Sequence, residues 1–299
     1  QLGAAPGMAA AVYIPADRAA LVWLIALLAG NFPVIIRAMA ANGPGAFFSD
    51  FLTLLVTFAG ETGPVMRLLE INDITYSLGM FLALFLAGRF ALGKRRMLFL
   101  LTLFCFLTGL KRIAVFAVLA AAAAGLFFTA IRRMRDLESW LLKLLGTVFL
   151  LGALAYVGAV YYGVYDYLES IGFDTNARAQ IYGLYHPYYR FSPAFLGNGT
   201  GWVDNMFRVW LDRAAAGEDI QAYHTHNDYL RGFIELGMIG ALLWYYFRFN
   251  FQVSRAFRAQ GQENGIVSLI LVVYLAVNYM TDPISAMEYV NATFAVGLL

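Results

Sequence analysis

Long apolar stretches alternate with short polar or basic ones along most of the chain. Several stretches approach the roughly 17 to 25 residues that cross a bilayer as a helix. Runs of this length do not alternate as the strands of a barrel do, so a helix is the only plausible spanning form. The pattern predicts about nine transmembrane helices. They cover residues 19–36, 47–59, 76–90, 97–110, 113–131, 139–162, 227–247 and 265–281, and a last segment from about residue 287.

The composition agrees with this pattern. Hydrophobic residues make up 61% of the 299 residues and charged ones only 13%, which is far from the usual makeup of a soluble domain. The single cysteine, Cys105, lies inside an apolar run, so the chain cannot form an internal disulfide. We therefore predict an all-α integral membrane protein, a polytopic helical bundle. Because the chain starts at Gln1 and stops at Leu299 in an apolar stretch, we expect a segment of a longer protein.

Basic clusters orient the predicted helices. Residues 93–96 and 132–135 each contain three basic residues, and the positive-inside rule places both clusters on the cytoplasmic side. Two helices separate the clusters, so Lys111 and Arg112 between them are expected on the outer side. A third cluster, around Arg255, falls on the predicted inner side. The expected organisation is transmembrane helices at 1–162, a large outer loop at 163–223 and further transmembrane helices at 224–299.

The outer loop is too long for a plain connector, since loops above about 15 residues usually carry function or structure of their own. We expect it to be partly helical. It contains four arginines, no lysine and many aromatic residues, Trp202 among them. Arginine binds phosphate through paired hydrogen bonds, and flat aromatic faces suit sugars or lipid headgroups, so the loop fits a phosphorylated amphiphile. The glycines of residues 196–202 resemble a phosphate cradle only weakly, and a tight turn is the default interpretation.

Two of the three histidines, His224 and His226, stand where this loop meets the next apolar stretch. His226 is either a base that activates an acceptor hydroxyl, since the usual pKa of histidine is about 6.5, or a structural residue that caps the helix. No carboxylate or third histidine has a recognisable ligand spacing, so we expect no metal site. A helix would also place one set of residues on a single face, where its glycines let another helix approach closely: His226, Leu230, Phe233, Gly237 and Gly240.

Two further charged pairs interrupt the apolar pattern. Lys111 and Arg112 are either a snorkelling pair at a short turn or cations that meet an anion such as a lipid diphosphate. Arg112 is the stronger candidate because of its planar fork. Arg231 and Glu235 are four residues apart on one predicted helix, and we expect them to form a structural ion pair.

Four of these features together resemble the O-antigen ligase and polymerase superfamily of bacterial membrane proteins, over roughly residues 76–260. The most specific is His226-Asn227 followed, after nine residues, by Gly237-Met238-Ile239-Gly240, which matches the H-[NSQ]-x9-GxxG motif of the ligases. Lys111-Arg112 is similar to a basic pair that the family carries between two helices. Arg178 precedes Leu196-Gly197-Asn198-Gly199 in the outer loop, and Arg190 and Gly201 fit an R-x10-G pattern of polymerases.

The resemblance implies a metal-independent glycosyltransferase, without a cofactor, at the periplasmic face of the bacterial inner membrane. Its donor would be a glycan on undecaprenyl diphosphate. His226 would act as the base, and Arg112 and Arg178 would contact the diphosphate or a sugar phosphate. Substrate-binding positions implied less directly are Lys111, Arg190, Asn227, His224 and Trp202.

Three functions remain open at this point. A polymerase would join lipid-linked glycan repeat units, with a chain-length regulator as a further partner. A ligase would transfer the finished glycan to lipid A core. A transporter would place ionisable residues at mid-membrane, whereas the charges here gather at the ends of the predicted helices. Membrane lipids are expected partners, and nucleic acid is not.

Overall fold

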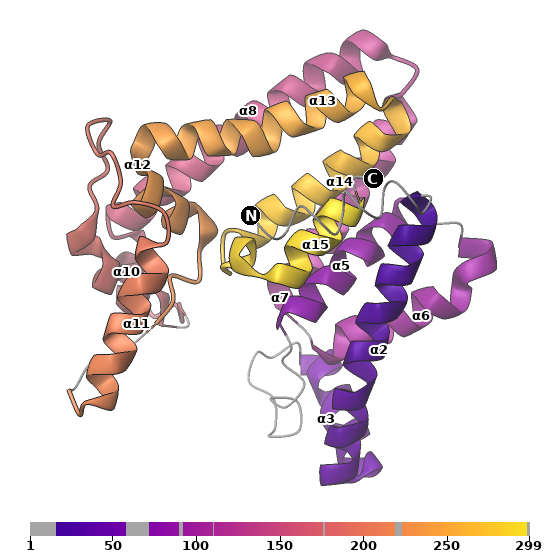
Figure 1. The fold of residues 1–299 in the computed structure, drawn as a ribbon, viewed down its shortest axis with the longest axis horizontal. Helices are drawn as coiled ribbons and strands as arrows, with labels where there is room; N and C mark the ends of the chain where they lie inside the picture. Colours follow the sequence, from indigo (N-terminus) through magenta and orange to yellow (C-terminus); the bar gives the residue numbers. More distant parts are fainter. Residues whose placement is uncertain are drawn as a thin grey trace. The chain divides into compact units, whose positions relative to one another are not determined.

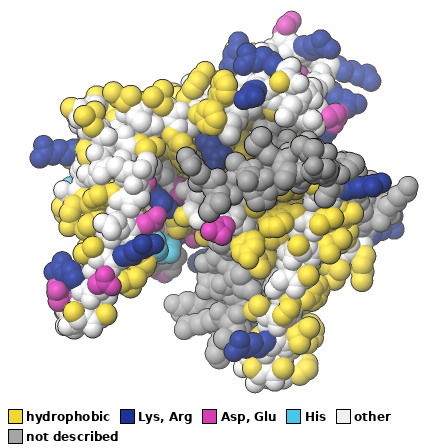
Figure 2. All heavy atoms as spheres, viewed as in Figure 1, with side chains coloured by type: hydrophobic (Ala, Val, Ile, Leu, Met, Phe, Trp, Pro, Cys, Tyr) yellow, Lys and Arg dark blue, Asp and Glu magenta, His cyan; other side chains and the backbone are white. Residues whose placement is uncertain are grey.

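The computed structural model of the chain describes residues 16–57, 72–89, 92–109, 111–175, 177–218 and 223–297. Within these ranges the regular structure is helical throughout, without a strand (Figure 1). Hydrophobic side chains are spread widely over the face seen in Figure 2. Such surfaces are expected of helices that meet lipid, and the all-α membrane fold class is confirmed.

Each of the nine predicted apolar stretches overlaps a helix. Three helices are long and apolar enough to cross a membrane: most of α2, and all of α7 and α8. Others, such as α3 and α14, are apolar but shorter, so the number of spans stays a prediction. Residues 58–59, 90 and 110 of the predicted stretches lie outside the described ranges. The nine helices are α2 (Ala16–Asn42), α3 (Pro44–Thr57), α5 (Asn72–Leu86), α6 (Leu92–Thr108), α7 (Arg112–Ile131), α8 (Arg135–Tyr161), α12 (Asp228–Tyr246), α14 (Gln262–Asn278) and α15 (Glu288–Gly297).

The segment predicted as an outer loop is partly helical, as expected. Short helices alternate with turns that contain left-handed glycines, for example Gly163 at φ 78° and Gly201 at φ 80°. The elements are α9 (Val164–Ser170), α10 (Arg178–Tyr185), the 3-10 turn η1 (His186–Tyr188) and α11 (Trp202–Ala215).

The chain forms two compact units, and the three-segment organisation stays a prediction. Unit 1 contains residues 1–135, 255–278 and 284–299. Helix α5 lies at its centre, against α2, α6, α7, α14 and α15, and it is buried along nearly its whole length. Small residues of α7, such as Ala117, Ala121 and Gly125, face inward and let α14 approach closely. Cys105 is buried in this unit as a free thiol.

Unit 2 contains residues 136–254 and 279–283. Helix α12 continues through a π-helical turn, η2 (Phe247–Phe251), into α13 (Gln252–Ala259). Helix α8 packs beside this rod, because the side chain of Asn250 fills the space next to Gly146 and the rings of Phe149 and Phe249 lie 5.5 Å apart. The outer-loop helices belong to the same unit, which therefore holds both histidines of the predicted site.

Replacing Gly125 tests the packing of α7 on α14. A Cβ there would overlap the side chain of Ile270 and press on Ala87. We expect Gly125→Leu to lower the free energy of unfolding by about 1–3 kcal/mol through overpacking, measured by thermal unfolding of the purified protein. Gly152→Leu is the matched control, because a Cβ at that helical position meets nothing within 4 Å. Equal unfolding midpoints for the two variants would contradict the close approach.

Candidate functional site

His226 lies just before helix α12 and not on its face. The helix begins at Asp228, and Asn227 is its N-cap, whose side-chain oxygen accepts a hydrogen bond of 3.0 Å from Leu230 N. The backbone of His226 has φ 43°, a left-handed conformation that is uncommon outside glycine. The predicted stripe that starts with His226 is therefore wrong at its first position. A capping side chain is present, but it is that of Asn227.

Gly237 interrupts α12. Its φ of 69° and ψ of −179° lie in a region open essentially only to glycine. In an unbroken helix Met238 N would donate to Ile234 O, but it donates to Phe195 O of the outer loop at 3.1 Å. The expectation that Gly237 serves close helix packing is therefore wrong, because a loop approaches it instead.

The loop of residues 195–199 completes the hydrogen bonds at this break. Asn198 N donates to Ile234 O at 2.9 Å, and Gly199 N donates to Glu235 O at 3.0 Å. These two amides are already used, so they do not cradle a phosphate. A turn follows them, in which Trp202 N donates to Gly199 O at 3.2 Å. A Cβ on either Gly197 or Gly237 would collide with the backbone of the other segment. The two glycine motifs, separate in the sequence analysis, are one structural feature.

Arg231 and Glu235 attach helix α11 to the first half of α12. The Arg231 Nε and a Glu235 carboxylate oxygen are 3.5 Å apart, so the predicted pair is confirmed. Arg231 also contacts the carboxylate of Asp204 at 2.6 Å. Glu235 accepts a hydrogen bond from Val203 N at 3.2 Å, which satisfies an amide in the first turn of α11 and places negative charge at its N-terminus. Asp204 could not be predicted from the sequence, because no local spacing links it to Arg231.

His224 is held against α11. Its ring centroid lies 3.8 Å from that of Phe207. Burial lowers the pKa of His224; the nearby Asp204 opposes this shift, while His226 and Arg231 add to it. The neutral imidazole is therefore favoured in the folded protein, and Arg231 places positive charge near His224.

Helix α10 carries Arg178 and Tyr182, and Tyr182 contacts the N-cap residue of α12. Arg178 begins α10, its Nη1 donates to Thr175 O at 3.4 Å, and its buried Nε has no hydrogen-bond partner among the described residues. Asn227 Nδ2 donates to the hydroxyl of Tyr182 at 3.4 Å. Burial, with Tyr165, raises the pKa of Tyr182 to about 12, and the positive charge of Arg178 opposes that rise. Asn227, which follows His226, thus bonds to a tyrosine whose raised pKa is partly opposed by the charge of Arg178.

The remaining predicted residues are Arg190, Trp202, Lys111 and Arg112. The side chain of Arg190 is exposed, and Trp202 packs against Tyr188 with ring centroids 5.1 Å apart. Lys111 and Arg112, at the start of α7, belong to unit 1. Their contribution to the site stays a prediction.

Tyrosines are the functional candidates that sequence reasoning did not single out. The hydroxyls of Tyr156 and Tyr165 are 2.7 Å apart, and the ring of Tyr165 meets that of Tyr182 at 4.9 Å. Tyr156 also donates to Met280 O at 2.8 Å. The contacts of these tyrosines form a series that ends at Asn227, which donates to Tyr182. The abundance of tyrosine between residues 156 and 189 was the available signal in the sequence.

A family model, described as O-antigen ligase, matches residues 97–245. The match runs from α6 into α12 and includes Lys111, Arg112, Arg178 and the His226-Asn227 pair. No curated protein and no solved structure gives a significant match.

Gly237→Ala tests the break in α12. The added methyl group meets both an unfavourable φ and the backbone of residues 195–197, so we expect a loss of unfolding free energy of about 1–3 kcal/mol or more. The thermal unfolding midpoint of the purified protein is the measurement. Gly232→Ala serves as control, since a Cβ there lies no closer than 3.7 Å to its neighbours. A wild-type midpoint for Gly237→Ala would contradict the described backbone.

His224 predicts a pH dependence of stability. Its folded-state pKa lies below the unfolded value of about 6.5, so the unfolded state binds the proton more readily. The stabilisation from neutral His224 is present above that value and is lost as the pH falls through 6.5 toward the folded pKa. We expect the unfolding midpoint of His224→Gln to fall less than that of wild type between pH 7 and about pH 5. The exposed His186, replaced by glutamine, is the control; identical pH profiles for His224→Gln and wild type would refute the assignment.

Proposed function

Because this chain belongs to the O-antigen ligase and polymerase superfamily, we propose that it polymerises lipid-linked glycan repeat units. The family implies a glycosyl-transferring membrane enzyme with lipid-linked glycan substrates. The proposed donor is an oligosaccharide on undecaprenyl diphosphate. The proposed location is the periplasmic face of the bacterial inner membrane, which follows from the positive-inside assignment of residues 93–96 and 132–135.

The observation that carries the proposal is the strained turn at His226. A left-handed backbone at a non-glycine residue costs on the order of 1–3 kcal/mol, and such strain clusters at functional sites. Asn227 fixes the turn from one side by capping α12 and by donating to Tyr182. His224, held by Phe207, fixes the chain just before it. This arrangement supports the proposal that the turn holds the His226 imidazole in a defined position for proton transfer.

In the proposed reaction, the acceptor sugar hydroxyl attacks the anomeric carbon of the donor. The bond between that carbon and the diphosphate oxygen breaks, the new glycosidic bond forms, and the hydroxyl proton passes to His226. Arg178 neutralises the leaving diphosphate, and its Nε, which has no hydrogen-bond partner in the described part of the chain, supports this role. Arg112 and Lys111, with Arg190, are proposed to extend the same positive charge along the lipid diphosphate, which would make a metal ion unnecessary.

The nearest alternative is a ligase that transfers the finished glycan to lipid A core. Both functions share the donor and differ in the acceptor. The Lys111-Arg112 pair and the spacing of Arg190 and Gly201 favour the polymerase. Trp202, whose ring centroid lies 5.1 Å from that of Tyr188, is a proposed surface for sugar rings in either function.

Replacing His226 tests the proposal. Loss of a general base typically lowers the rate 10²–10⁴-fold, so His226→Ala should retain membrane insertion but show about that loss of glycan transfer from a purified lipid-linked donor. His186→Ala is the control, because this exposed histidine stacks on Tyr161 and lies outside the His226-Asn227 motif. Wild-type transfer by His226→Ala would refute the base assignment.

The glycan ladder distinguishes the two acceptors. It is compared between a null strain complemented with the wild-type gene and the same strain complemented with the His226→Ala gene. For a polymerase, the His226→Ala strain lacks long chains but keeps single repeat units on the lipid A core. For a ligase, it accumulates full-length polymer on the lipid carrier. The second result would replace the polymerase proposal with the alternative.

A further inference from the structure

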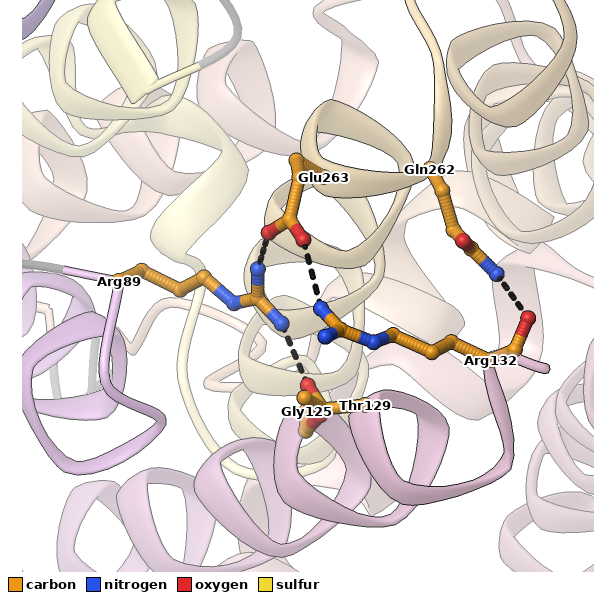
Figure 3. Close-up of polar contacts among 6 residues, drawn as sticks. All are labelled: Arg89, Gly125, Thr129, Arg132, Gln262 and Glu263. Carbon is orange, nitrogen blue, oxygen red and sulfur yellow. Dashed lines mark hydrogen bonds and ion pairs between the residues drawn. The ribbon is translucent and has the colours of Figure 1, made fainter.

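Two arginines of unit 1 share one carboxylate where three helices end or begin. Figure 3 shows the guanidinium groups of Arg89 and Arg132 both directed at Glu263. Arg89 follows α5, Arg132 is the C-cap of α7, and Glu263 stands in the first turn of α14. Arg89 also donates to Thr129. The cluster therefore joins α5, α7 and α14 at one end of unit 1.

The charges in this cluster do not balance. Two positive groups face one negative group, and burial together with the repulsion of Arg132 lowers the pKa of Arg89. The side chain of Arg89 is only 10% exposed, whereas those of Arg132 and Glu263 are 47% and 63% exposed. Arg132 Nη1 donates a hydrogen bond of 3.1 Å to Glu263. A guanidinium has five N–H donors, so one bond to Glu263 does not use its full capacity. A further anion at Arg132 would relieve the excess positive charge.

The surroundings of Arg132 point to a lipid as the source of that anion. Arg132 lies in the short connection between α7 and α8, which are both long and apolar enough to cross a membrane, so the connection lies at a membrane surface. The next two residues, Arg133 and Met134, are exposed, and Met134 is 59% accessible. An exposed apolar side chain beside two arginines fits the boundary between headgroups and acyl chains.

The connection is also fixed in place. Gln262 Nε2 donates to Arg132 O at 2.8 Å, which satisfies a carbonyl at the C-terminus of α7. The start of α14 thus holds both the backbone and the guanidinium of Arg132. A held arginine loses less freedom on binding an anion than a mobile one does.

From these observations we propose that Arg132 and Arg133 bind the phosphate of an anionic phospholipid headgroup. Arginine recognises phosphate through paired hydrogen bonds, and juxtamembrane basic clusters attract anionic lipids. Glu263 is the internal competitor, since it occupies part of the same guanidinium. The bound lipid balances the charge that Glu263 leaves uncompensated and stabilises the junction of α5, α7 and α14. The site is independent of the glycan chemistry.

The test uses the full chain in nanodiscs of phosphatidylcholine, with or without phosphatidylglycerol. We expect phosphatidylglycerol to raise the thermal unfolding midpoint by a few degrees, on the order of 2–4 °C. Arg132→Gln and Arg133→Gln should each lose most of this rise. Arg208→Gln, at an exposed position of α11, is the matched control and should keep it. If phosphatidylglycerol raised the midpoint of both Arg132→Gln and Arg133→Gln as much as that of the wild type, the proposed lipid site would be refuted.

Glu263→Gln should change the effect of phosphatidylglycerol on the unfolding midpoint in the direction opposite to the arginine variants. This difference separates lipid binding from a merely structural role. Removing the competitor should lower the midpoint in phosphatidylcholine, because Arg89 and Arg132 then repel each other unscreened, but should enlarge the rise with phosphatidylglycerol. A smaller rise would overturn the proposal. Inorganic phosphate at matched ionic strength is the remaining arm: an equal rise without the anionic lipid would assign the site to a soluble anion. Retention of phosphatidylglycerol in native mass spectrometry, reduced in Arg132→Gln, provides a second readout.

Discussion

The hydrogen-bond requirement at the break in α12 governs much of unit 2. Backbone polar groups are costly to leave unpaired, above all where water is scarce. Gly237 removes Met238 N from its helical acceptor, and the loop at 195–199 supplies an acceptor for that amide and donors for the carbonyls of residues 234 and 235. The positions of the loop, of α11 and of the first half of α12 are consequences of this exchange.

Side-chain contacts then connect the break in α12 to the histidines. Glu235 sits next to the break and pairs with Arg231, which holds Asp204 of α11. Helix α11 in turn carries Phe207 to the ring of His224. A second connection joins Tyr182 of α10 to Asn227. His224 before the strained residue is thus held by α11, and Asn227 after it is held by α10. Such surrounding contacts allow a strained backbone to persist.

The sequence predicted the helices well because hydrophobic length and the absence of alternation are strong signals for a membrane chain. Arg231 and Glu235 were also predictable, since a spacing of four is local information. The break at Gly237 was not, because two glycines three apart in an apolar run also describe a packing face. The contacts of Arg231 with Asp204 and of Asn227 with Tyr182 join residues 27 and 45 positions apart, and no pattern along the chain encodes them.

The break in α12 also sets an order of events during biosynthesis. The loop at 195–199 emerges from the ribosome before residues 234–238, so its donors and acceptor already exist when Gly237 is made. Helix α12 cannot complete its hydrogen bonds on its own, whereas a continuous helix could do so as soon as it was inserted. The backbone pairing of α12 is therefore complete only when the loop at 195–199 docks against the break.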